Sequence, residues 1–263
     1  MSAQDKLLSD RKTMDALLSC IMDMGELLLT SGAEVVRVED TIRRLATAYG
    51  FMRVDVFSIT SSIVVTVQDK DGQVFTQTRR ISDRNTDLQK VALVNSLSRQ
   101  VCAAPICVEE FRARLGSIQK TKAYPLSVQC LCYAVISTAF AVFFGGTAMD
   151  GLAAALSGIL IFVTQLALGK LRINNLLQSV LVSAFTALAV VIMVRFGIGD
   201  SPAKITIGNI MLLIPGIAFT TSLRDLISGD TISGLIGLCE AIVKAIAIAI
   251  GFAIVLVQAG GAL

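Results

Sequence analysis

The first 125 positions alternate between a helical and an extended pattern of apolar residues. Four segments carry apolar residues every three or four positions, which predicts amphipathic helices, and two stretches rich in β-branched residues flank a turn signal at Asp69–Gly72, which predicts strands. Gly32 and Gly50 are predicted to end the first two helices. The predicted order is therefore ααβββαα, with helical segments at 5–30, 33–49, 83–101 and 108–118 and strand-forming stretches at 52–67 and 74–80.

From residue 126 the pattern becomes continuously apolar. Five long apolar segments follow, and four of them approach the ~20 residues that a helix needs to cross a bilayer. The fourth is shorter and is interrupted by Pro215-Gly216. The predicted fold class is an α+β soluble N-terminal domain (1–125) followed by an α-helical transmembrane bundle of about five helices (126–263). The predicted spans are 126–145, 148–168, 176–196, 205–221 and 232–257.

The distribution of charge supports this division. Residues 1–125 hold 17 of the 23 Lys and Arg residues and 15 of the 20 Asp and Glu residues, although the mean hydropathy of the whole chain is +0.72. Water is thus the expected solvent of the first half and lipid that of the second. The net charge of +3 is too small to suggest a nucleic-acid partner.

The basic residues between the apolar segments predict an orientation. The N-terminus carries acids early and lacks a continuous apolar stretch, so we expect no signal peptide and a cytoplasmic first half. Loops on that side would then be richer in basic residues, as the positive-inside rule requires, and five spans would place the C-terminus outside. The inside loops would hold Lys120, Lys122, Lys170, Arg172 and Arg224, against Arg195 and Lys204 outside.

Composition restricts the chemistry that the chain can perform. It contains no histidine, which excludes a His general base, a Ser–His–Asp triad and a His-ligated metal within this chain. The six cysteines form no CxxC motif, and we expect them to be free structural thiols. We therefore predict no catalytic residue, no metal site and no cofactor.

Two charged residues fall near the middle of the fifth apolar segment. Glu240 and Lys244 are four positions apart and so share a face of the predicted helix. An isolated charge at that depth costs at least ~2.5–3 kcal/mol, so the two can form an ion pair that faces protein or a water-filled path. They indicate either a substrate or proton pathway or a structural pair that joins this helix to a neighbour.

The stretch from 212 to 234 is the second candidate for the pathway. Pro215 removes a backbone donor and Gly216 loosens the chain beside it, and transporters use such broken helices to bind substrate. The alternative is an ordinary proline kink followed by a charged loop, in which Asp230 caps the fifth helix. Asn209 is expected to hydrogen-bond between helices. The pathway candidates are Glu240, Lys244, Asn209, Pro215, Gly216, Arg224, Asp225 and Asp230.

Charged residues also crowd the starts of two predicted helices in the first half. Acids at a helix N-terminus are favoured by the helix dipole, and surface ion pairs explain more of this pattern. The same residues could instead form a gate or contact the solute. These candidates are Glu34, Arg37, Glu39, Asp40, Arg80, Asp83, Arg84 and Asn85.

Four stretches together resemble the threonine/serine exporter family. They are SGAEVVRVEDTIRRL (31–45), SITSSIVVTV (58–67), RRISDRNTDL (79–88) and LLIPGIAFTTSLRDLISGDTISGL (212–235). With the soluble-then-five-spans layout, the resemblance covers nearly the whole chain and matches the N-terminal half as it occurs in the split, two-protein (YjjP-like) form.

The resemblance implies an inner-membrane exporter of small polar metabolites, either threonine/serine-type amino acids or C4-dicarboxylates, that depends on the proton gradient. It also implies an oligomeric assembly in which a second small membrane protein (YjjB-like) supplies the C-terminal half. Two other hypotheses use the first half differently, as a membrane-tethered enzyme or as a regulatory scaffold for a separate carrier.

Overall fold

The computed structural model describes residues 11–82, 85–171 and 173–259, which are mostly helical with one three-stranded sheet. The chain divides into two compact units. The first unit comprises the described residues up to Lys122 together with Ile217–Leu238. The second unit comprises Ala123–Gly216 and the described residues from Cys239 onward.

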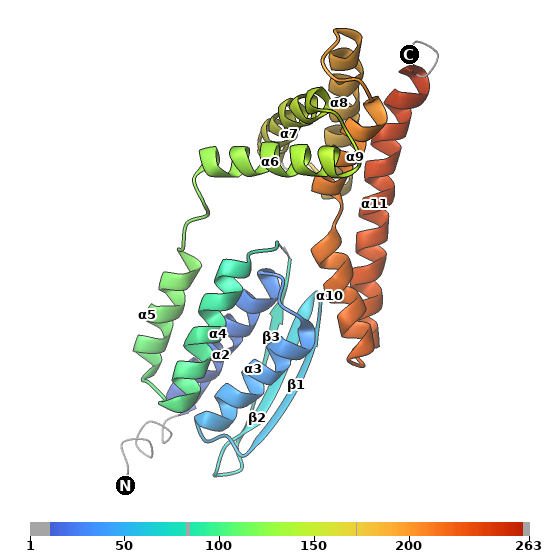
Figure 1. Ribbon diagram of the computed structural model, residues 1–263. Helices are drawn as coiled ribbons and strands as arrows, with labels where there is room; N and C mark the ends of the chain where they lie inside the picture. Colours follow the sequence, from blue (N-terminus) through green and yellow to red (C-terminus); the bar gives the residue numbers. More distant parts are fainter. Residues whose placement is uncertain (1–10, 83–84, 172, 260–263) are drawn as a thin grey trace. The chain divides into compact units, whose positions relative to one another are not determined.

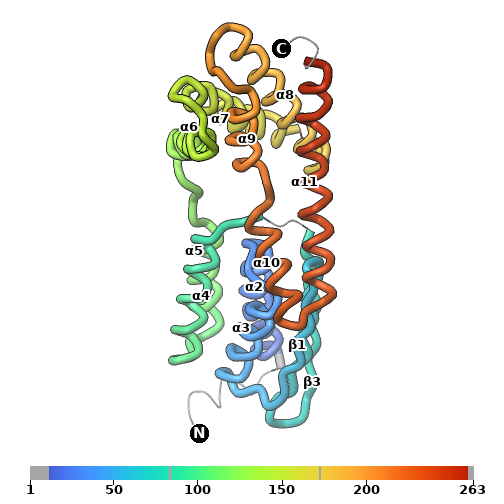
Figure 2. The backbone as a smooth tube through the Cα atoms, turned by 45° about the vertical axis from the view of Figure 1, so that its right-hand side comes forward, coloured from blue at the N-terminus to red at the C-terminus, as the bar shows by residue number. Residues whose placement is uncertain are grey.

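The first unit confirms the predicted order of helices and strands. Helices α2 and α3 pack on the sheet, and α4 and α5 pack against each other (Figures 1 and 2). One apolar core joins these elements. The elements are α2 (Arg11–Thr30), α3 (Val35–Ala48), β1 (Arg53–Ile59), β2 (Ser62–Gln68), β3 (Val74–Arg80), α4 (Leu88–Ala103) and α5 (Val108–Gln119).

Both predicted glycine stops are confirmed. Gly32 and Gly50 adopt φ values of +88° and +91°, in the left-handed region that glycine enters without a steric penalty. The amide of Gly32 donates to the carbonyl of Leu29, and the next amide donates to Leu28. This pair of hydrogen bonds satisfies carbonyls that the helix end would otherwise leave open.

The three strands form an antiparallel meander in the order β1-β2-β3. Phe57 pairs with Val64, and Val64 pairs with Thr78. Alternate residues of β2 point into the core, so Ile63 and Val65 are fully buried. The predicted turn at Asp69–Gly72 connects β2 to β3.

Helix α4 begins later than the sequence predicted. The expected start was residue 83, whereas the first helical residue is Leu88. Asp87 stands at the N-cap, and its Oδ1 accepts the amide of Lys90 at 3.0 Å. A capping aspartate satisfies one amide of the first turn and so fixes where the helix begins.

The described part of the chain contains four helices long and apolar enough to cross a membrane, or five if a broken pair counts as one span. The break lies at the predicted position, between α9 and α10, since Ile214 and Pro215 are not helical. The elements are α6 (Leu126–Phe143), α7 (Ala148–Gly169), α8 (Asn175–Arg195), α9 (Pro202–Leu213), α10 (Gly216–Ile227) and α11 (Thr231–Ala259).

Glycines allow close helix packing in the second unit, where α6, α7 and α9 contact one another (Figure 1). A methyl group on Gly158 would lie 2.7 Å from the backbone oxygen of Tyr133, and one on Gly208 would lie 2.6 Å from that of Ser137. Small residues at such contacts let backbones approach and gain van der Waals energy, which drives helix association in lipid.

Helix α11 is longer than a bilayer requires. At about 1.5 Å per residue, its 29 residues extend about 43 Å, whereas the hydrocarbon core is about 30 Å thick. Thr231–Leu238 belong to the first unit and the rest of the helix to the second. The sequence predicted a start at 232 and so placed the N-terminal boundary within one residue.

Candidate functional site

The two charged residues of α11 are not paired with each other. Glu240 and Lys244 are both exposed, and none of the ion pairs among the described residues joins them. The expectation of an ion pair is therefore wrong for this structure. The helical spacing brings the residues onto one face, but the surroundings of each side chain differ.

Lys244 lines a small pocket of the second unit with a volume of about 220 Å³. Drug-sized ligands occupy pockets of roughly 300–1,000 Å³, so this one suits a solute of only a few heavy atoms. The polar wall comes from the C-terminal part of α7 and the first turns of α8. Its other lining residues are Gln165, Asn175, Gln178, Ser179, Val182, Leu213 and Ile248.

Hydrogen bonds hold the polar wall in place. The hydroxyl of Tyr133 donates to Gln165 Oε1 at 2.7 Å, and Gln178 Nε2 donates to the backbone oxygen of Gln165 at 3.3 Å. Ser179 Oγ donates to the backbone oxygen of Asn175 at 2.9 Å. Four helices (α6, α7, α8 and α11) thus contribute to one polar site.

The local sequence explains why α8 starts at this site. Asn174 precedes the helix, and its side chain accepts the amide of Leu176 at 2.8 Å. Asparagine is a preferred N-cap because its short side chain reaches the first free amides. Asn175, Gln178 and Ser179 therefore occupy the N-terminal turns, where the helix dipole favours negative charge.

The chemistry of this lining favours an anionic group. Lys244 supplies one ammonium, the amides and the hydroxyl supply neutral hydrogen-bonding groups, and no carboxylate of the described residues lines the pocket. A carboxylate bound there would gain a charge-assisted hydrogen bond. The pocket can accordingly bind a small carboxylate and orient it by neutral contacts.

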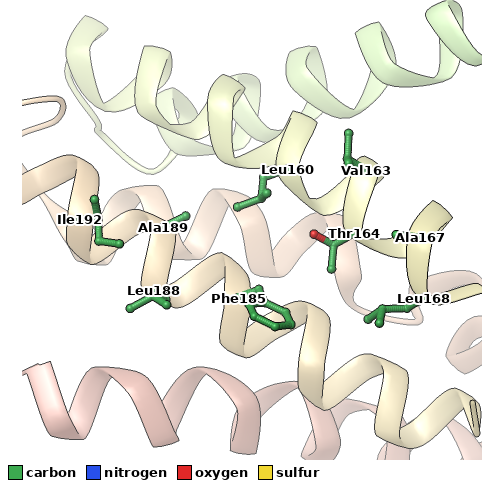
Figure 3. A pocket seen from close by; sticks show the side chains of 9 residues that line it. All are labelled: Leu160, Val163, Thr164, Ala167, Leu168, Phe185, Leu188, Ala189 and Ile192. Atoms are coloured by element: carbon green, nitrogen blue, oxygen red, sulfur yellow. The ribbon is translucent and has the colours of Figure 1, made fainter.

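A larger hollow on the α7–α8 surface has a different character. Its volume is about 450 Å³, and its side chains are apolar except for Thr164 (Figure 3). It offers no charged group to a polar solute. The Lys244 pocket is therefore the better candidate, although it is the smaller one.

Asn209 lies at the centre of a buried polar contact between three helices. Its Nδ2 donates to Ser157 Oγ at 2.7 Å, and the hydroxyl of Ser137 donates to its Oδ1. All three side chains are at most 1% exposed. The structure thus agrees with the interhelical role expected of Asn209, and its role in a pathway stays a prediction.

The charged residues after the Pro215-Gly216 break lie in the first unit. Arg224 Nη1 is 2.7 Å from Glu34 Oε1, which joins α10 to the start of α3. Asp225 is buried at 5% exposure. Asp230 Oδ1 accepts the amide of Ser233 at 3.3 Å and so caps α11, as the second interpretation predicted.

The remaining gate candidates are dispersed. Glu39 Oε1 accepts the amide of Ser58 at 2.7 Å and thereby ties α3 to β1. Asp40 pairs with Arg44 along α3 at 2.7 Å. Arg37 and Arg80 are exposed, Asn85 Oδ1 accepts the amide of Thr86, and Asp83 and Arg84 lie outside the described residues. Among the gate candidates that the structure describes, Glu34 is the one with an ion pair to α10.

Burial keeps the internal thiols and one phenol of the first unit protonated. Burial raises the pKa of the Cys20 and Cys102 thiols, and it raises the pKa of Tyr49 to about 12. Tyr49 Oη donates to the backbone oxygen of Ile106 at 2.9 Å. Because the thiolate is the nucleophilic form, these two cysteines behave as core residues at neutral pH.

The sequence reasoning missed several polar residues of the second unit. Asp150 is fully buried, and its carboxylate accepts the amides of Thr147, Asp200 and Ser201 at 2.8–2.9 Å. The signal was present as the capping-box spacing of Thr147 and Asp150. No such signal marks Tyr133, Gln165 and Gln178, because uncharged polar residues do not stand out in a membrane helix as charged residues do.

In the part of the chain that the structure describes, no group of three or more Cys, Asp or Glu side chains could hold a metal ion. All six cysteines are free.

Comparisons with known proteins agree on one family. The family model described as "Putative threonine/serine exporter" matches residues 19–258. The "Threonine/serine exporter" of Corynebacterium glutamicum is 25% identical over 234 residues, which cover 86% of this chain and 48% of that protein. The "Probable threonine/serine exporter" of Mycobacterium tuberculosis is 24% identical over 251 residues, which cover 94% of this chain and 46% of that protein.

A shorter relative is matched over most of its length. The "Probable succinate transporter subunit YjjP" of Escherichia coli is 23% identical over 233 residues, which cover 84% of this chain and 86% of that protein. The chain thus spans about half the length of the two exporters above. No solved structure matches it.

Proposed function

Because the chain belongs to the threonine/serine exporter family, we propose that it is one subunit of an exporter that moves small polar carboxylates across the cell membrane. It is a multi-pass membrane protein with four to five candidate spans. The observation that carries the proposal is the position of Lys244, an ammonium on a spanning helix that lines a small polar pocket. Charged residues inside spans are costly and usually serve function.

The names of the relatives define the range of solutes. Two relatives are named for threonine and serine, and another is named for succinate. All three compounds contain a carboxylate and few heavy atoms. A pocket of about 220 Å³ with one ammonium suits that common group.

A second membrane protein would complete the exporter. The family members that are about twice as long carry additional sequence, whereas the relative of similar length is named a transporter subunit. We propose that the second protein supplies the part of the longer exporters that this chain does not match. The assembly would be an oligomer of the two.

We further propose that the first unit faces the cytoplasm, that the C-terminus lies outside and that the proton gradient drives export. The basic residues Lys120, Lys122 and Lys170 support this orientation under the positive-inside rule. The exposed carboxylate of Glu240 on α11 is the candidate proton carrier. In this scheme the first unit supports transport and performs no catalysis.

Reconstitution of this chain with its second subunit, and no other protein, tests the proposal. Proteoliposomes loaded with labelled threonine or succinate should release one of them when a proton gradient is imposed. Lys244→Gln should reduce the release, whereas Lys170→Gln, which changes an exposed lysine at the end of α7, should not. Absence of release of both solutes would overturn the exporter function, and release only after a third protein is added would favour a regulatory role.

A further inference from the structure

We propose that the Lys244 pocket is a carboxylate-binding subsite in which the ammonium of Lys244 and the side-chain amide of Gln165 are the donors. This inference rests on the proposed export function and narrows it to solutes with net negative charge. It also assigns Tyr133 as a positioning residue that orients the Gln165 amide.

The Tyr133–Gln165 hydrogen bond determines what Gln165 presents to the pocket. Tyr133 Oη donates to Gln165 Oε1 at 2.7 Å, so the amide oxygen is occupied. Among the described residues, no hydrogen bond is made by Gln165 Nε2. A carboxamide whose oxygen is engaged in this way offers its two N–H donors to the lining, and donors are what a carboxylate requires.

Neighbouring contacts hold Tyr133 in this position. Its ring lies 5.3 Å from that of Phe162, tilted by 60°, which is a favourable aromatic arrangement. Gly158 allows α7 to approach the backbone of Tyr133 closely. The hydroxyl of Tyr133 on α6 is therefore held within hydrogen-bonding distance of Gln165 on α7, where the two helices are in direct contact.

Among the described residues, the lining supplies no anionic partner for a cation, only the neutral oxygens of its amides and hydroxyl. A zwitterionic amino acid brings an ammonium, which needs an anionic or strongly accepting neighbour when it leaves water. In the part of the chain that the structure describes, no acidic side chain lines the pocket, and Glu240, one helical turn before Lys244, is not part of it. The lining thus favours a dicarboxylate or another net-anionic carboxylate over threonine or serine.

Binding to the complete complex tests the charge preference. With labelled succinate and threonine as probes, the complex of this chain and its second subunit should bind succinate more tightly. Lys244→Gln should weaken succinate binding by about tenfold or more, because a charge-assisted contact is lost, while Lys244→Arg should retain most of it. Lys170→Gln is the matched control and should bind succinate like the wild type.

Two further variants test the donor arrangement. Gln165→Glu has nearly the same shape but places a negative charge where the amide donors were. It should weaken succinate binding by about tenfold or more, because the carboxylate of succinate would be repelled and its hydrogen bond lost. It should weaken threonine binding by less, because threonine has no net charge. Tyr133→Phe removes only the hydroxyl that orients the amide. It should raise the KM for succinate by about three- to tenfold and leave kcat within about twofold. Tyr124→Phe, at an exposed position, is its control.

The outcomes separate this inference from the export function. If the complex exports threonine but neither binds nor exports succinate, the anionic preference is wrong and the exporter function stands. If Lys244→Gln and Gln165→Glu bind succinate like the wild type, the subsite is misplaced. If Tyr133→Phe lowers kcat and thermal stability while KM is unchanged, Tyr133 is structural only. If the complex exports no carboxylate but its succinate binding depends on Lys244, the exporter function is wrong and the assignment of the subsite stands.

Discussion

The guanidinium of Arg224 lies 2.7 Å from the carboxylate of Glu34, so an ion pair joins α10 to the start of α3. Glu34 is the N-cap residue of α3, but its side chain caps no amide of that helix. Its carboxylate is therefore available to α10. Through this contact, a helix that follows the Pro215-Gly216 break is attached to the N-terminal part of the chain.

Removing either partner should weaken this attachment. The Arg224 side chain is 62% exposed and that of Glu34 is 18% exposed, so the pair lies at the edge of the solvent, where ion pairs contribute about 0.2–1 kcal/mol. A double-mutant cycle with Glu34→Gln and Arg224→Gln, measured by thermal unfolding of the purified protein, should give a coupling energy in that range. Because salt screens exposed charges, the coupling should fall at high ionic strength.

The pair of Asp40 and Arg44 on α3 is the matched control. It is similarly short, is more exposed (49% at Asp40 against 18% at Glu34) and lies within a single helix. Its disruption should leave efflux unchanged, whereas disruption of the Glu34–Arg224 pair should slow it. Equal effects of the two pairs on efflux would contradict a special role for the contact with α10.

Asp150→Asn should destabilise the second unit. The buried carboxylate accepts three backbone amides, from Thr147, Asp200 and Ser201, and a carboxamide replaces one acceptor oxygen by a donor. Each buried N–H that loses its acceptor costs about 1–3 kcal/mol. The six free cysteines permit thermal unfolding to be followed with a thiol-reactive dye. Asp71→Asn, at an exposed turn position, should leave the transition unchanged.

Two glycines of α7 should respond in opposite ways to alanine. The added methyl of Gly158→Ala would meet the α6 backbone at 2.7 Å and force the helices apart, so we expect a loss of about 1–3 kcal/mol. No atom lies within 4 Å of the corresponding position at Gly169, among the described residues. Gly169→Ala should be neutral or stabilising by up to about 1 kcal/mol. The thermal unfolding midpoints of the two variants and the wild type, measured in the same detergent, check this prediction. Equal midpoints for Gly158→Ala and the wild type would contradict it.

Glu240→Gln should uncouple export from the proton gradient. The side chain is not covered by other residues of this chain and forms none of the ion pairs of the described residues, and a carboxylate on a spanning helix is a candidate proton carrier. Gradient-driven efflux in proteoliposomes should fall, while exchange of solute for solute without a gradient should persist. Glu240→Asp keeps a titratable group and should retain part of the driven efflux. Normal driven efflux by the glutamine variant would remove Glu240 from the mechanism.

The local signals in the sequence predicted most of the helices and strands. Apolar periodicity depends on near neighbours in the chain, and the stops at Gly32 and Gly50 depend on backbone conformation alone. The interruption at Pro215 was predictable for the same reason, because proline lacks the amide that a helix needs. The start of α4 was predicted about five residues too early, although residues 83–87 are all polar and the apolar positions begin only at Leu88, after the Asp87 cap.

The candidate site was only partly predictable. Lys244 was identified because a charge inside an apolar segment is conspicuous, but its expected partner was Glu240, four positions away. The actual neighbours, Gln165 and Gln178, are neutral and distant in the sequence. Glu34 and Arg224 were noted separately, and nothing in their spacing indicated that they pair.

The sequence by itself thus determined which segments are helical, which are extended and which are apolar enough to span a membrane, since these properties follow from residues a few positions apart. Only the tertiary structure decided which polar groups meet. The helices α7, α8, α9 and α11 together place one ammonium, three amides and one hydroxyl around a single small pocket. Side chains on different helices meet through packing, and packing is a property of the whole bundle.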